Sequence, residues 1–313
     1  MKIPFFDALS DSKSILIAGA GGGFDVASGI PIYLYLRKLG KPVVLANLSF
    51  TALPSTDSEE ICPGTYRITQ ESRDIPYFPE KFILEWLSTR GENPDIYACS
   101  NKLGVIPLGH AYSVITQKYG IDTLILVDGG TDSLMFGDEV GVGTIVEDAC
   151  SIIAAAKVPI AHRYLVATGF GVDYFHDLNH HACLENIATL TRDGAYLGAI
   201  ALTQDMDEGR DYLELVEYLN QRLPGYMSIV ANSIASAIRG EFGNFHVTPR
   251  TKGSELFINP FMGLFWFFQL RGVAARIAFA SKIDTSETMH EVAQGFRLFR
   301  AMTTRRTPKN IPL

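Results

Sequence analysis

The chain has 313 residues, of which 47% are hydrophobic and 19% are charged. Such a chain is long enough for a sizeable core, built either as one large α/β domain or as two closely packed lobes. The formal net charge is −7, and neither Lys nor Arg forms a block. We therefore expect no binding to nucleic acid or to an anionic membrane surface.

The cysteines and the apolar segments indicate the cellular compartment. The four cysteines lie far apart and form no C-x-x-C pair; they are Cys62, Cys99, Cys150 and Cys183. This spacing argues against a disulfide framework and favours reduced thiols in a cytoplasm. Residues 1–7 lack the apolar stretch of a signal peptide, and the most apolar run, 256–270, is too short and interrupted to span a bilayer. We expect that run to be buried, and the basic cluster at 304–309 to be a solvated tail.

Apolar runs of strand length alternate with segments of helical spacing along most of the chain. In chain order, the pattern predicts a strand at 14–18, a helix at 30–39, a strand at 42–48, a helix at 79–89, a strand at 95–100, a helix at 107–119, a strand at 123–127, a helix at 144–156, a strand at 162–168, a helix at 173–191, a strand at 196–202, and helices at 212–222, 227–238 and 285–302. Residues 53–79 are rich in Pro, Ser, Thr and charge. We expect them to form an excursion outside the core, either a lid or an arm of a homo-oligomer.

Several of the predicted strands are apolar on both faces, which is typical of a parallel sheet covered by helices on both sides. The alternation of strands and helices continues to about residue 225 without a break in composition. We therefore predict an α/β fold with a doubly wound, mainly parallel, Rossmann-like sheet in residues 1–225. Residues 226–313 are expected to form an irregular C-terminal extension that packs on the same domain.

The first glycine-rich loop, 19–26, follows the first predicted strand. Its consecutive amides at Gly21, Gly22 and Gly23 can converge on an anion, so we predict that the loop binds phosphate. A carboxylate beside a bare phosphate is repulsive. Asp25 is therefore expected to cap a helix, hold a ribose hydroxyl, bind an amine or approach phosphate through a metal ion. Close packing of a tight turn is the competing interpretation of the glycines.

Other residues around this loop bear on its ligand and its shape. An NAD-binding fingerprint needs a small residue where Phe24 stands and an acid at the end of the second strand, where Asn47 stands. Both departures argue against NAD. Because proline is tolerated in the first turn of a helix, Pro31 predicts that the next helix begins near Ser28.

The second loop, 128–133, follows the clearest central strand and offers two carboxylates and two hydroxyls in six residues. Ligands bind beyond the carboxyl ends of parallel strands, so Gly130 and Ser133 are predicted to contact the ligand. Asp128 and Asp132 are predicted to act as metal ligands or as a general base. Capping of a turn by Asp132 or Ser133 is the alternative.

The third loop, 169–173, again follows a buried strand. Gly171 and Asp173 are predicted to face the ligand, with helix capping as the alternative for Asp173. His176 and His180 stand four residues apart on the predicted helix, a spacing that can bind a metal ion. No second cluster of His and Cys completes such a site, so polar packing is the competing interpretation.

A polar, glycine-containing segment at 240–254 lies between apolar flanks, which suggests that it packs back on the domain. Arg250 can meet an anion with two parallel hydrogen bonds, and His246 can serve as a catalytic acid or base. Asn244 is a further candidate ligand contact. A surface loop without a function is the alternative.

Three stretches of the chain resemble the DUF1152 family, an uncharacterised family of bacteria and archaea. They are "ILIAGAGGGFDVASGIPIYLYLRKLGKPVVLANLSF", "LILVDGGTDSLMFGDE" and "ATGFGVDYFHDLNH". The resemblance implies that the motif positions are Gly21, Gly22, Gly23 and Asp25, then Asp128, Gly130 and Asp132, then Gly169, Gly171 and Asp173. Because the family has no established reaction, it implies a fold and candidate positions rather than an activity.

The acids at 25, 128, 132 and 173 are predicted to meet at one edge of the sheet, beside glycine loops. We expect an enzyme that acts on a phosphorylated or ribose-containing small molecule by hydrolysis or group transfer. Mg²⁺ is the cofactor that such hard oxygen ligands favour. A noncatalytic nucleotide-sensing module is the alternative, and an NAD-dependent oxidoreductase is the third hypothesis.

Overall fold

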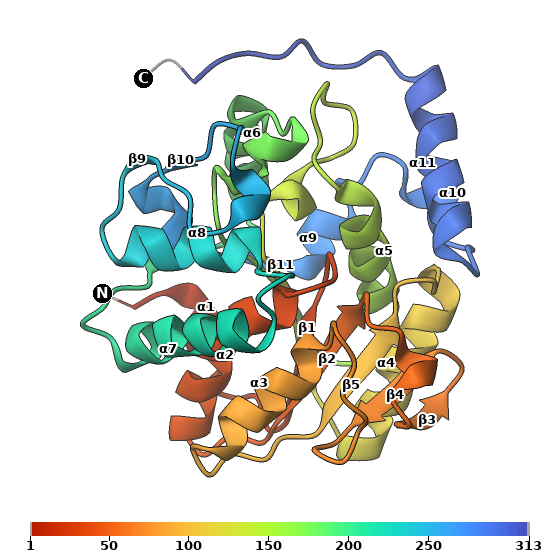
Figure 1. The fold of residues 1–313 in the computed structure, drawn as a ribbon. Coiled ribbons are helices and arrows are strands. Elements are labelled where there is room, and N and C mark those ends of the chain that lie inside the picture. Colours follow the sequence, from red (N-terminus) through yellow and green to blue (C-terminus); the bar gives the residue numbers. More distant parts are fainter. Residues whose placement is uncertain (1, 312–313) are drawn as a thin grey trace.

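The computed structural model describes residues 2–311, apart from the side chain of Phe175. The strands shown in Figure 1 are β1 (Ile15–Gly19), β2 (Val43–Ser49), β3 (Glu59–Cys62), β4 (Thr65–Ile68), β5 (Ile96–Ser100), β6 (Thr123–Asp128), β7 (His162–Ala167), β8 (Tyr196–Ala201), β9 (Gly243–Asn244), β10 (Phe257–Ile258) and β11 (Leu264–Gln269). The α-helices are α1 (Pro4–Ala8), α2 (Asp25–Lys38), α3 (Pro79–Ser88), α4 (Val105–Tyr119), α5 (Ile145–Ala156), α6 (His180–Arg192), α7 (Asp207–Arg222), α8 (Ile229–Ile238), α9 (Leu270–Ala274), α10 (Ala280–Ile283) and α11 (Met289–Met302). Short 3-10 helices are η1 (Leu53–Ser55), η2 (Asp132–Leu134), η3 (Val172–His176), η4 (Pro249–Thr251) and η5 (Pro260–Gly263).

Nine of the strands form one mixed sheet in the order β3-β4-β5-β2-β1-β6-β7-β11-β8. The five central strands, β5-β2-β1-β6-β7, are parallel to one another. From β1 the chain proceeds outward through β2 to β5, and then returns to the other side of β1 to build β6 and β7. This reversal is the doubly wound arrangement, so the predicted α/β fold is confirmed.

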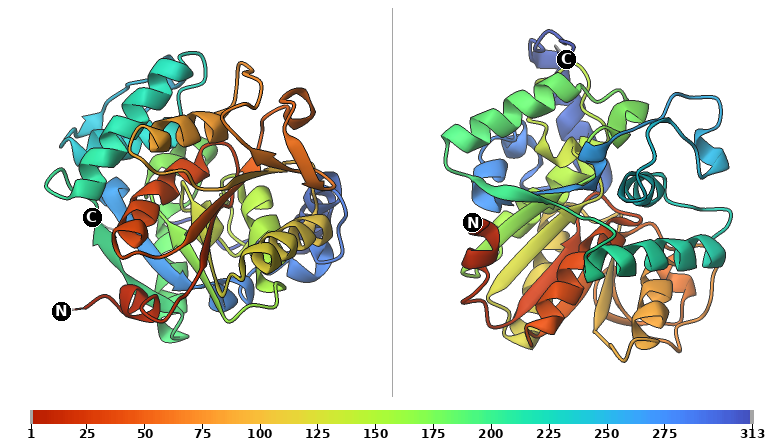
Figure 2. Two further views of the ribbon diagram at one scale, coloured as in Figure 1. Left: turned by 90° about the horizontal axis from the view of Figure 1, so that it is seen from below. Right: turned by 90° about the vertical axis from the view of Figure 1, so that its left-hand side faces the viewer.

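Two cores cover the two faces of this sheet, as the helices on both sides of the strands indicate in Figure 2. Alternate residues of a strand point to opposite faces. Thus Leu16 and Leu124 enter the core formed with α4 and α5. Ile17 and Ile125 enter the core formed with α2, α3 and α7. This double burial explains why the central strands are apolar throughout.

Residues 59–68 of the segment 53–79 form a hairpin at the edge of the sheet, which corrects the interpretation of the whole segment as an excursion outside the core. Its hairpin pairs β3 with β4, and β4 pairs antiparallel with β5. Thr65 and Ile68 are buried there, at 0% and 2% exposure. An edge hairpin of this kind buries few side chains and keeps a polar composition, which is why the sequence pattern resembled a loop.

The C-terminal part also contributes to the main sheet. Strand β11 lies between β7 and β8 and pairs antiparallel with both. Phe265, Phe267 and Phe268 are at most 2% exposed. The apolar run 256–270 is therefore buried, as predicted, along β11, whereas Phe257 and Phe261 before this strand are 49% and 52% exposed.

Arg306 ties the basic segment at 304–309 to the body of the protein, whereas the other five residues of the segment are exposed, as predicted for a solvated tail. Arg306 donates to Glu139 Oε1 at 2.5 Å and to Asp138 Oδ1 at 3.0 Å. The Glu139 side chain is only 1% exposed. In Figure 1 the chain after α11 accordingly runs back across the molecule. A buried acid needs a partner, and Arg306 supplies its charge.

All four cysteines are free thiols, and Cys99, Cys150 and Cys183 are buried. Burial raises the pKa of both Cys99 and Cys150 to about 12, so these thiols are inert rather than reactive. Among the described residues, no helix combines the length and the apolar character needed to cross a membrane.

Candidate functional site

A cavity of about 930 Å³ opens beyond the carboxyl ends of β1 and β6. These two neighbours are the strands from which the chain winds in opposite directions, and such a switch point leaves a crevice between diverging loops. The loops after β1 and β6 line the cavity, together with the first turn of α5 and the segment before α8. The cavity thus lies at the predicted edge of the sheet.

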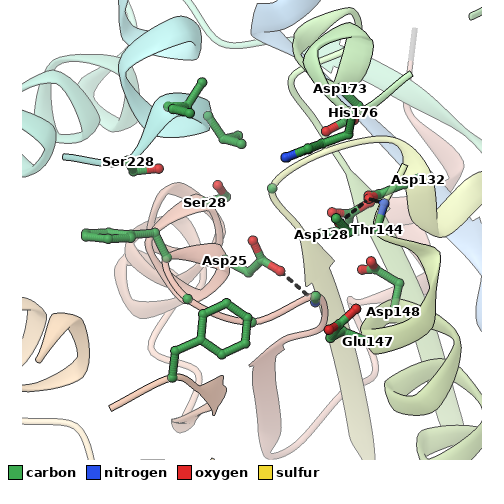
Figure 3. A pocket seen from close by; sticks show the side chains of 18 of the residues that line it. Asp25, Ser28, Asp128, Asp132, Thr144, Glu147, Asp148, Asp173, His176 and Ser228 are labelled. Atoms are coloured by element: carbon green, nitrogen blue, oxygen red, sulfur yellow. Dashed lines mark hydrogen bonds between the residues drawn. The ribbon is translucent and has the colours of Figure 1, made fainter. Parts of the chain in front are cut away.

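Three carboxylates form the centre of this cavity. One oxygen from each of Asp25, Asp128 and Asp148 lies within 4.8 Å of the others. Asp25 opens α2, Asp128 ends β6, and Asp148 lies in the first turn of α5. Figure 3 shows Asp128 and Asp148 on one side of the cavity, Ser28 and Ser228 on the other, and Asp25 between them. We call these three residues the acid cluster.

The first glycine loop holds the carboxylate of Asp25. The amide of Gly21 donates to Asp25 Oδ2 at 2.6 Å, and the nearby amides of Gly22 and Gly129 also favour the charged carboxylate. The loop's amides therefore serve a carboxylate of the same chain, so we do not assign the Gly21 amide to phosphate. Gly22 and Gly23 line the cavity.

Helix α2 begins at Asp25, three residues earlier than predicted. Pro31 consequently lies inside the helix rather than in its first turn. Proline in a helix interior removes one hydrogen bond, and here the helix is buried along most of its length, so tertiary packing outweighs that loss. The loop between β1 and α2 is therefore short and comprises residues 20–24.

Asn47, in strand β2, holds the glycine loop through its side-chain amide. Its side-chain amide donates to the carbonyl of Gly23 at 2.9 Å and to Glu80 Oε1 at 2.7 Å. Asn47 is 1% exposed and Glu80 is fully buried. The residue at the end of β2 is therefore a buried brace of the loop.

Asp148 is the member of the acid cluster with the least support from the protein. Its side chain is 1% exposed, and its Oδ1 has no hydrogen-bond partner among the described residues. By contrast, Asp128 Oδ2 accepts the amide of Ser133 at 3.2 Å. A buried carboxylate oxygen without a donor destabilises the fold, because its hydrogen bonds to water are lost and no protein donor replaces them.

Two further acids border the cluster and are held by threonines. Asp132 Oδ2 accepts the amide and the hydroxyl of Thr144 at 2.8 and 2.6 Å. Asp173 Oδ2 accepts the amide of Thr131 at 2.7 Å and its hydroxyl at 3.3 Å. Both acids line the cavity. Asp132 is not part of the three-acid group, so of the two predicted metal ligands only Asp128 belongs to the acid cluster.

Burial and mutual repulsion disfavour the charged forms of these acids. Burial, together with the charge of Asp132, raises the pKa of Asp25 to about 7, although hydrogen bonds from the glycine amides oppose the shift. Burial also holds the pKa values of Asp128, Asp148 and Asp173 well above their usual range, with neighbouring acids adding to the effect. Without a counter-charge the cavity is therefore an unfavourable place for so many carboxylates, and a cation would reduce their mutual repulsion.

Three predicted ligand contacts are not among the residues that line the cavity. Ser133, Gly130 and Gly171 are absent from the lining. The amide of Ser133 serves Asp128, and its hydroxyl is buried without a partner. A Cβ on Gly130 would lie 2.9 Å from Asp173 Oδ2. Gly130 thus leaves space for the acids, and its role is indirect.

His176 and His180 do not share a helix, which corrects the basis of the predicted histidine site. His176 ends η3 and His180 begins α6. Between them Asp177 has a positive φ of 60°, which breaks the helical path. His176 lines the cavity, whereas His180 packs against the rings of Phe170 and Tyr174. Burial lowers the pKa of His180 to about 4, so it is neutral near pH 7.

Of the three candidates in the C-terminal part, only Arg250 reaches the cavity. His246 and Asn244 lie outside it, which corrects the expectation that they contribute to the site. The His246 ring is bonded to Thr251 Oγ1 and to Asn244 Oδ1, each at 2.8 Å. These contacts stabilise the 244–251 loop itself.

The sequence analysis missed several residues of the cavity. Asp148 and Glu147 belong to a helix, where acids in a first turn are ordinary. Aromatic side chains come from separate segments; they are Phe24, Phe50, Tyr77 and Tyr226. Only a weak indication of Asp148 was present in the sequence, namely two adjacent acids in the first turn of the helix that follows the Asp128 loop.

The model of the DUF1152 family, described as a protein of unknown function, matches residues 55–304. Because the match covers well over half of the chain, this protein belongs to the DUF1152 family. No curated protein and no solved structure matches the chain significantly.

Proposed function

We propose that this member of the DUF1152 family is an enzyme that acts on a phosphorylated small molecule with the help of a divalent metal ion. The reaction class is hydrolysis or group transfer at phosphorus or at a glycosidic carbon. The observation that carries the proposal is the acid cluster, in which Asp148 Oδ1 is buried without a hydrogen-bond partner among the described residues.

A metal ion at the acid cluster explains features that are otherwise unfavourable. Three carboxylate oxygens within 4.8 Å of one another repel when they are charged. A divalent cation between Asp25, Asp128 and Asp148 would turn this repulsion into attraction and supply the partner that Asp148 Oδ1 lacks. An all-oxygen donor set with no Cys or His favours Mg²⁺ over Zn²⁺.

A protein site with few carboxylates usually leaves part of the Mg²⁺ coordination sphere to water and substrate phosphate. In this proposal the phosphate approaches through the metal, which also resolves why Asp25 lies where a bare phosphate would be repelled. Arg250 lines the same cavity and supplies positive charge for the substrate anion.

Asp132 is the candidate general base. It lines the cavity beside the acid cluster, and the amide and hydroxyl of Thr144 orient its carboxylate through Oδ2. An oriented carboxylate next to the metal can accept the proton of an attacking water or hydroxyl. Asp173 is held in the same manner by Thr131 and adds to the negative field.

The same cavity is compatible with a noncatalytic sensor, and measured turnover distinguishes the two functions. An NAD-dependent redox function has less support. Asn47, at the position of the usual ribose-binding acid, is buried and engaged with Gly23 and Glu80.

The proposal is tested by titration calorimetry of the full chain with MgCl₂ and then with a panel of nucleotides and sugar phosphates, each with Mg²⁺ or with EDTA. We expect Mg²⁺ to bind, and a phosphorylated compound to bind only when Mg²⁺ is present. The compounds that bind are then incubated with the enzyme and their products are followed by phosphorus NMR.

Two variants make the test specific. Asp148→Asn should lose Mg²⁺ binding, whereas Asp205→Asn, at an exposed acid outside the cavity, should retain it. Absence of Mg²⁺ binding by the wild type, or of any Mg²⁺-dependent ligand in the panel, would rule the proposal out.

A further inference from the structure

The cavity has a second, aromatic side that the acid cluster does not explain. Phe24 and Tyr77 meet edge to face at 5.8 Å and 81°, and Tyr77 meets Tyr226 in the same way at 5.4 Å and 71°. Phe50 belongs to the same wall. These four rings come from four separate segments of the chain. We call them the aromatic wall.

Phe50 is the ring of the aromatic wall that is best placed to receive a ligand. It lies on the backbone of the glycine loop: a Cβ on Gly22 would be 2.7 Å from Phe50 Cε1 and 2.8 Å from Cζ. A Cβ on Gly23 would be 3.5 Å from Cδ2. Side chains at these glycines would displace the ring. The glycines thus provide a bare surface on which an aromatic ring rests.

Despite this support from below, Phe50 is 48% exposed, and Tyr226 is 46% exposed. Large aromatic side chains that line a cavity and remain half exposed are typical of ligand contacts rather than of a core. Phe50 packs on the loop through ring atoms that include Cε1 and Cζ, and the residue also lines the cavity. This is the geometry of a stacking platform for a flat ring.

The charge on the aromatic side distinguishes between flat ligands and organic cations. Aromatic cages for ammonium groups rely on ring faces and on the absence of a competing cation. Here Arg250 lines the cavity beside the rings. Its positive charge lowers the pKa of Tyr77, whereas burial and the negative charges of Glu80 and Asp25 raise it. A neighbouring guanidinium repels an organic cation and suits an anionic ligand.

From these observations we infer that the substrate is a nucleotide, whose base stacks on Phe50 beside Tyr226 while its phosphate approaches the acid cluster. The inference rests on the proposed function, because it assigns the phosphate to the metal side of the same cavity. A volume of about 930 Å³ lies at the upper end of the range for small-molecule sites, and it leaves room for both a base and a sugar phosphate.

The experiment compares ligands that differ only in the base. The full chain, saturated with Mg²⁺, is titrated with the four ribonucleoside 5′-monophosphates and with ribose 5-phosphate. We expect at least one nucleotide to bind about tenfold more tightly than ribose 5-phosphate, since stacking of a base on an aromatic side chain is worth about 5- to 150-fold in affinity. A parallel titration with spermidine tests whether the cavity binds an organic cation instead of a phosphate.

Substitutions of Phe50 test whether this ring causes the preference for a nucleotide over ribose 5-phosphate. Phe50→Leu should weaken the nucleotide about fivefold or more, and Phe50→Trp should retain the affinity. Binding of ribose 5-phosphate and of Mg²⁺ should not change in either variant. Phe242→Leu is the matched control, because Phe242 is 70% exposed and lies outside the cavity lining.

Equal affinity for ribose 5-phosphate and every nucleotide would overturn the nucleotide inference and leave the metal-dependent function standing. Equal effects of Phe50→Leu and Phe242→Leu would overturn it as well. If Mg²⁺ binds but neither class of phosphate does, or if spermidine binds in their place, the proposed function fails together with the inference.

Discussion

The main-chain amide of Gly21 donates a hydrogen bond of 2.6 Å to Oδ2 of Asp25. The glycine loop after β1 therefore encloses an anion that belongs to the protein. The role of the loop therefore differs from phosphate binding by its amides, because the Gly21 amide positions a carboxylate that could hold a metal ion. In the proposed function, phosphate would therefore approach through the metal ion rather than through the amides of the loop.

A side chain at Gly21 should disrupt the acid cluster directly. Its Cβ would lie 2.8 Å from Asp148 Oδ1 and 3.0 Å from Asp25 Oδ2. We expect Gly21→Ala to weaken Mg²⁺ binding about tenfold or more, because the carboxylates must move apart. Gly225→Ala is the control, since Gly225 lines the same cavity and a Cβ there would meet nothing within 4 Å. Similar Mg²⁺ affinities for the two variants in calorimetry would contradict this view of the loop.

Removing the charge of Asp148 should stabilise the protein when no metal is present. The side chain is buried among like charges, and Oδ1 has no partner among the described residues. We expect Asp148→Asn to raise the free energy of unfolding in EDTA by about 1–3 kcal/mol. Mg²⁺ should then raise the melting temperature of the wild type but not of the variant. A variant less stable than the wild type in EDTA would show that Asp148 has a structural partner.

The stability of the metal-free protein should fall as the pH rises from about 4 to about 7. Burial raises the pKa of Asp25 from 3.8 to about 7, so the folded state binds more protons than the unfolded state in this interval. The stability that protonated Asp25 contributes is complete below pH 4 and is lost as the pH rises through 7. The slope for one such group is at most about 1.4 kcal/mol per pH unit.

Urea unfolding in EDTA at pH 5, 6, 7 and 8 measures this slope, and Asp25→Asn should reduce it. Saturating Mg²⁺ should flatten the curve of the wild type, because the ion stabilises the charged carboxylate. Parallel curves for the wild type and Asp25→Asn would exclude a raised pKa for this residue.

Arg306 should contribute to stability although it lies in the C-terminal tail. Its guanidinium donates hydrogen bonds to Glu139 Oε1 at 2.5 Å and to Asn186 Oδ1 at 2.8 Å. Arg306→Ala leaves Glu139 buried without its cation, so we expect a loss of about 1–3 kcal/mol in urea unfolding. Arg305→Ala, at the exposed neighbour, should change stability by about 0.5 kcal/mol or less. Equal losses of stability in Arg306→Ala and Arg305→Ala would show that the contacts of Arg306 do not stabilise the fold.

Local patterns in the sequence were sufficient for the central fold. The strands at β1, β2, β5, β6 and β7 are apolar on both faces, and this double burial follows from their position between two helical layers. Once the sheet is parallel, its strand ends share one edge. Asp25, Asp128, Asp132 and Asp173 could therefore be predicted to converge, and all four line one cavity.

Pairings between distant segments could not be predicted in the same way. Strand β11 enters the sheet between β7 and β8, and the 53–79 segment adds a hairpin beyond β5. Such partners are selected by long-range packing, which leaves little trace in a local pattern. The helical spacing of His176 and His180 was likewise misleading, because the backbone at Asp177 reverses into the left-handed region.

The sequence by itself determined the fold class and the edge of the sheet where a ligand is expected, because alternation and burial are local properties of each element. Only the tertiary structure decided which acids meet. Asp148 comes from helix α5 and joins Asp25 and Asp128 through packing of that helix on the sheet. The structure also showed that the glycine amides face Asp25 and that Phe50 rests on the same loop. These relationships depend on the distances between segments, which no stretch of the sequence contains.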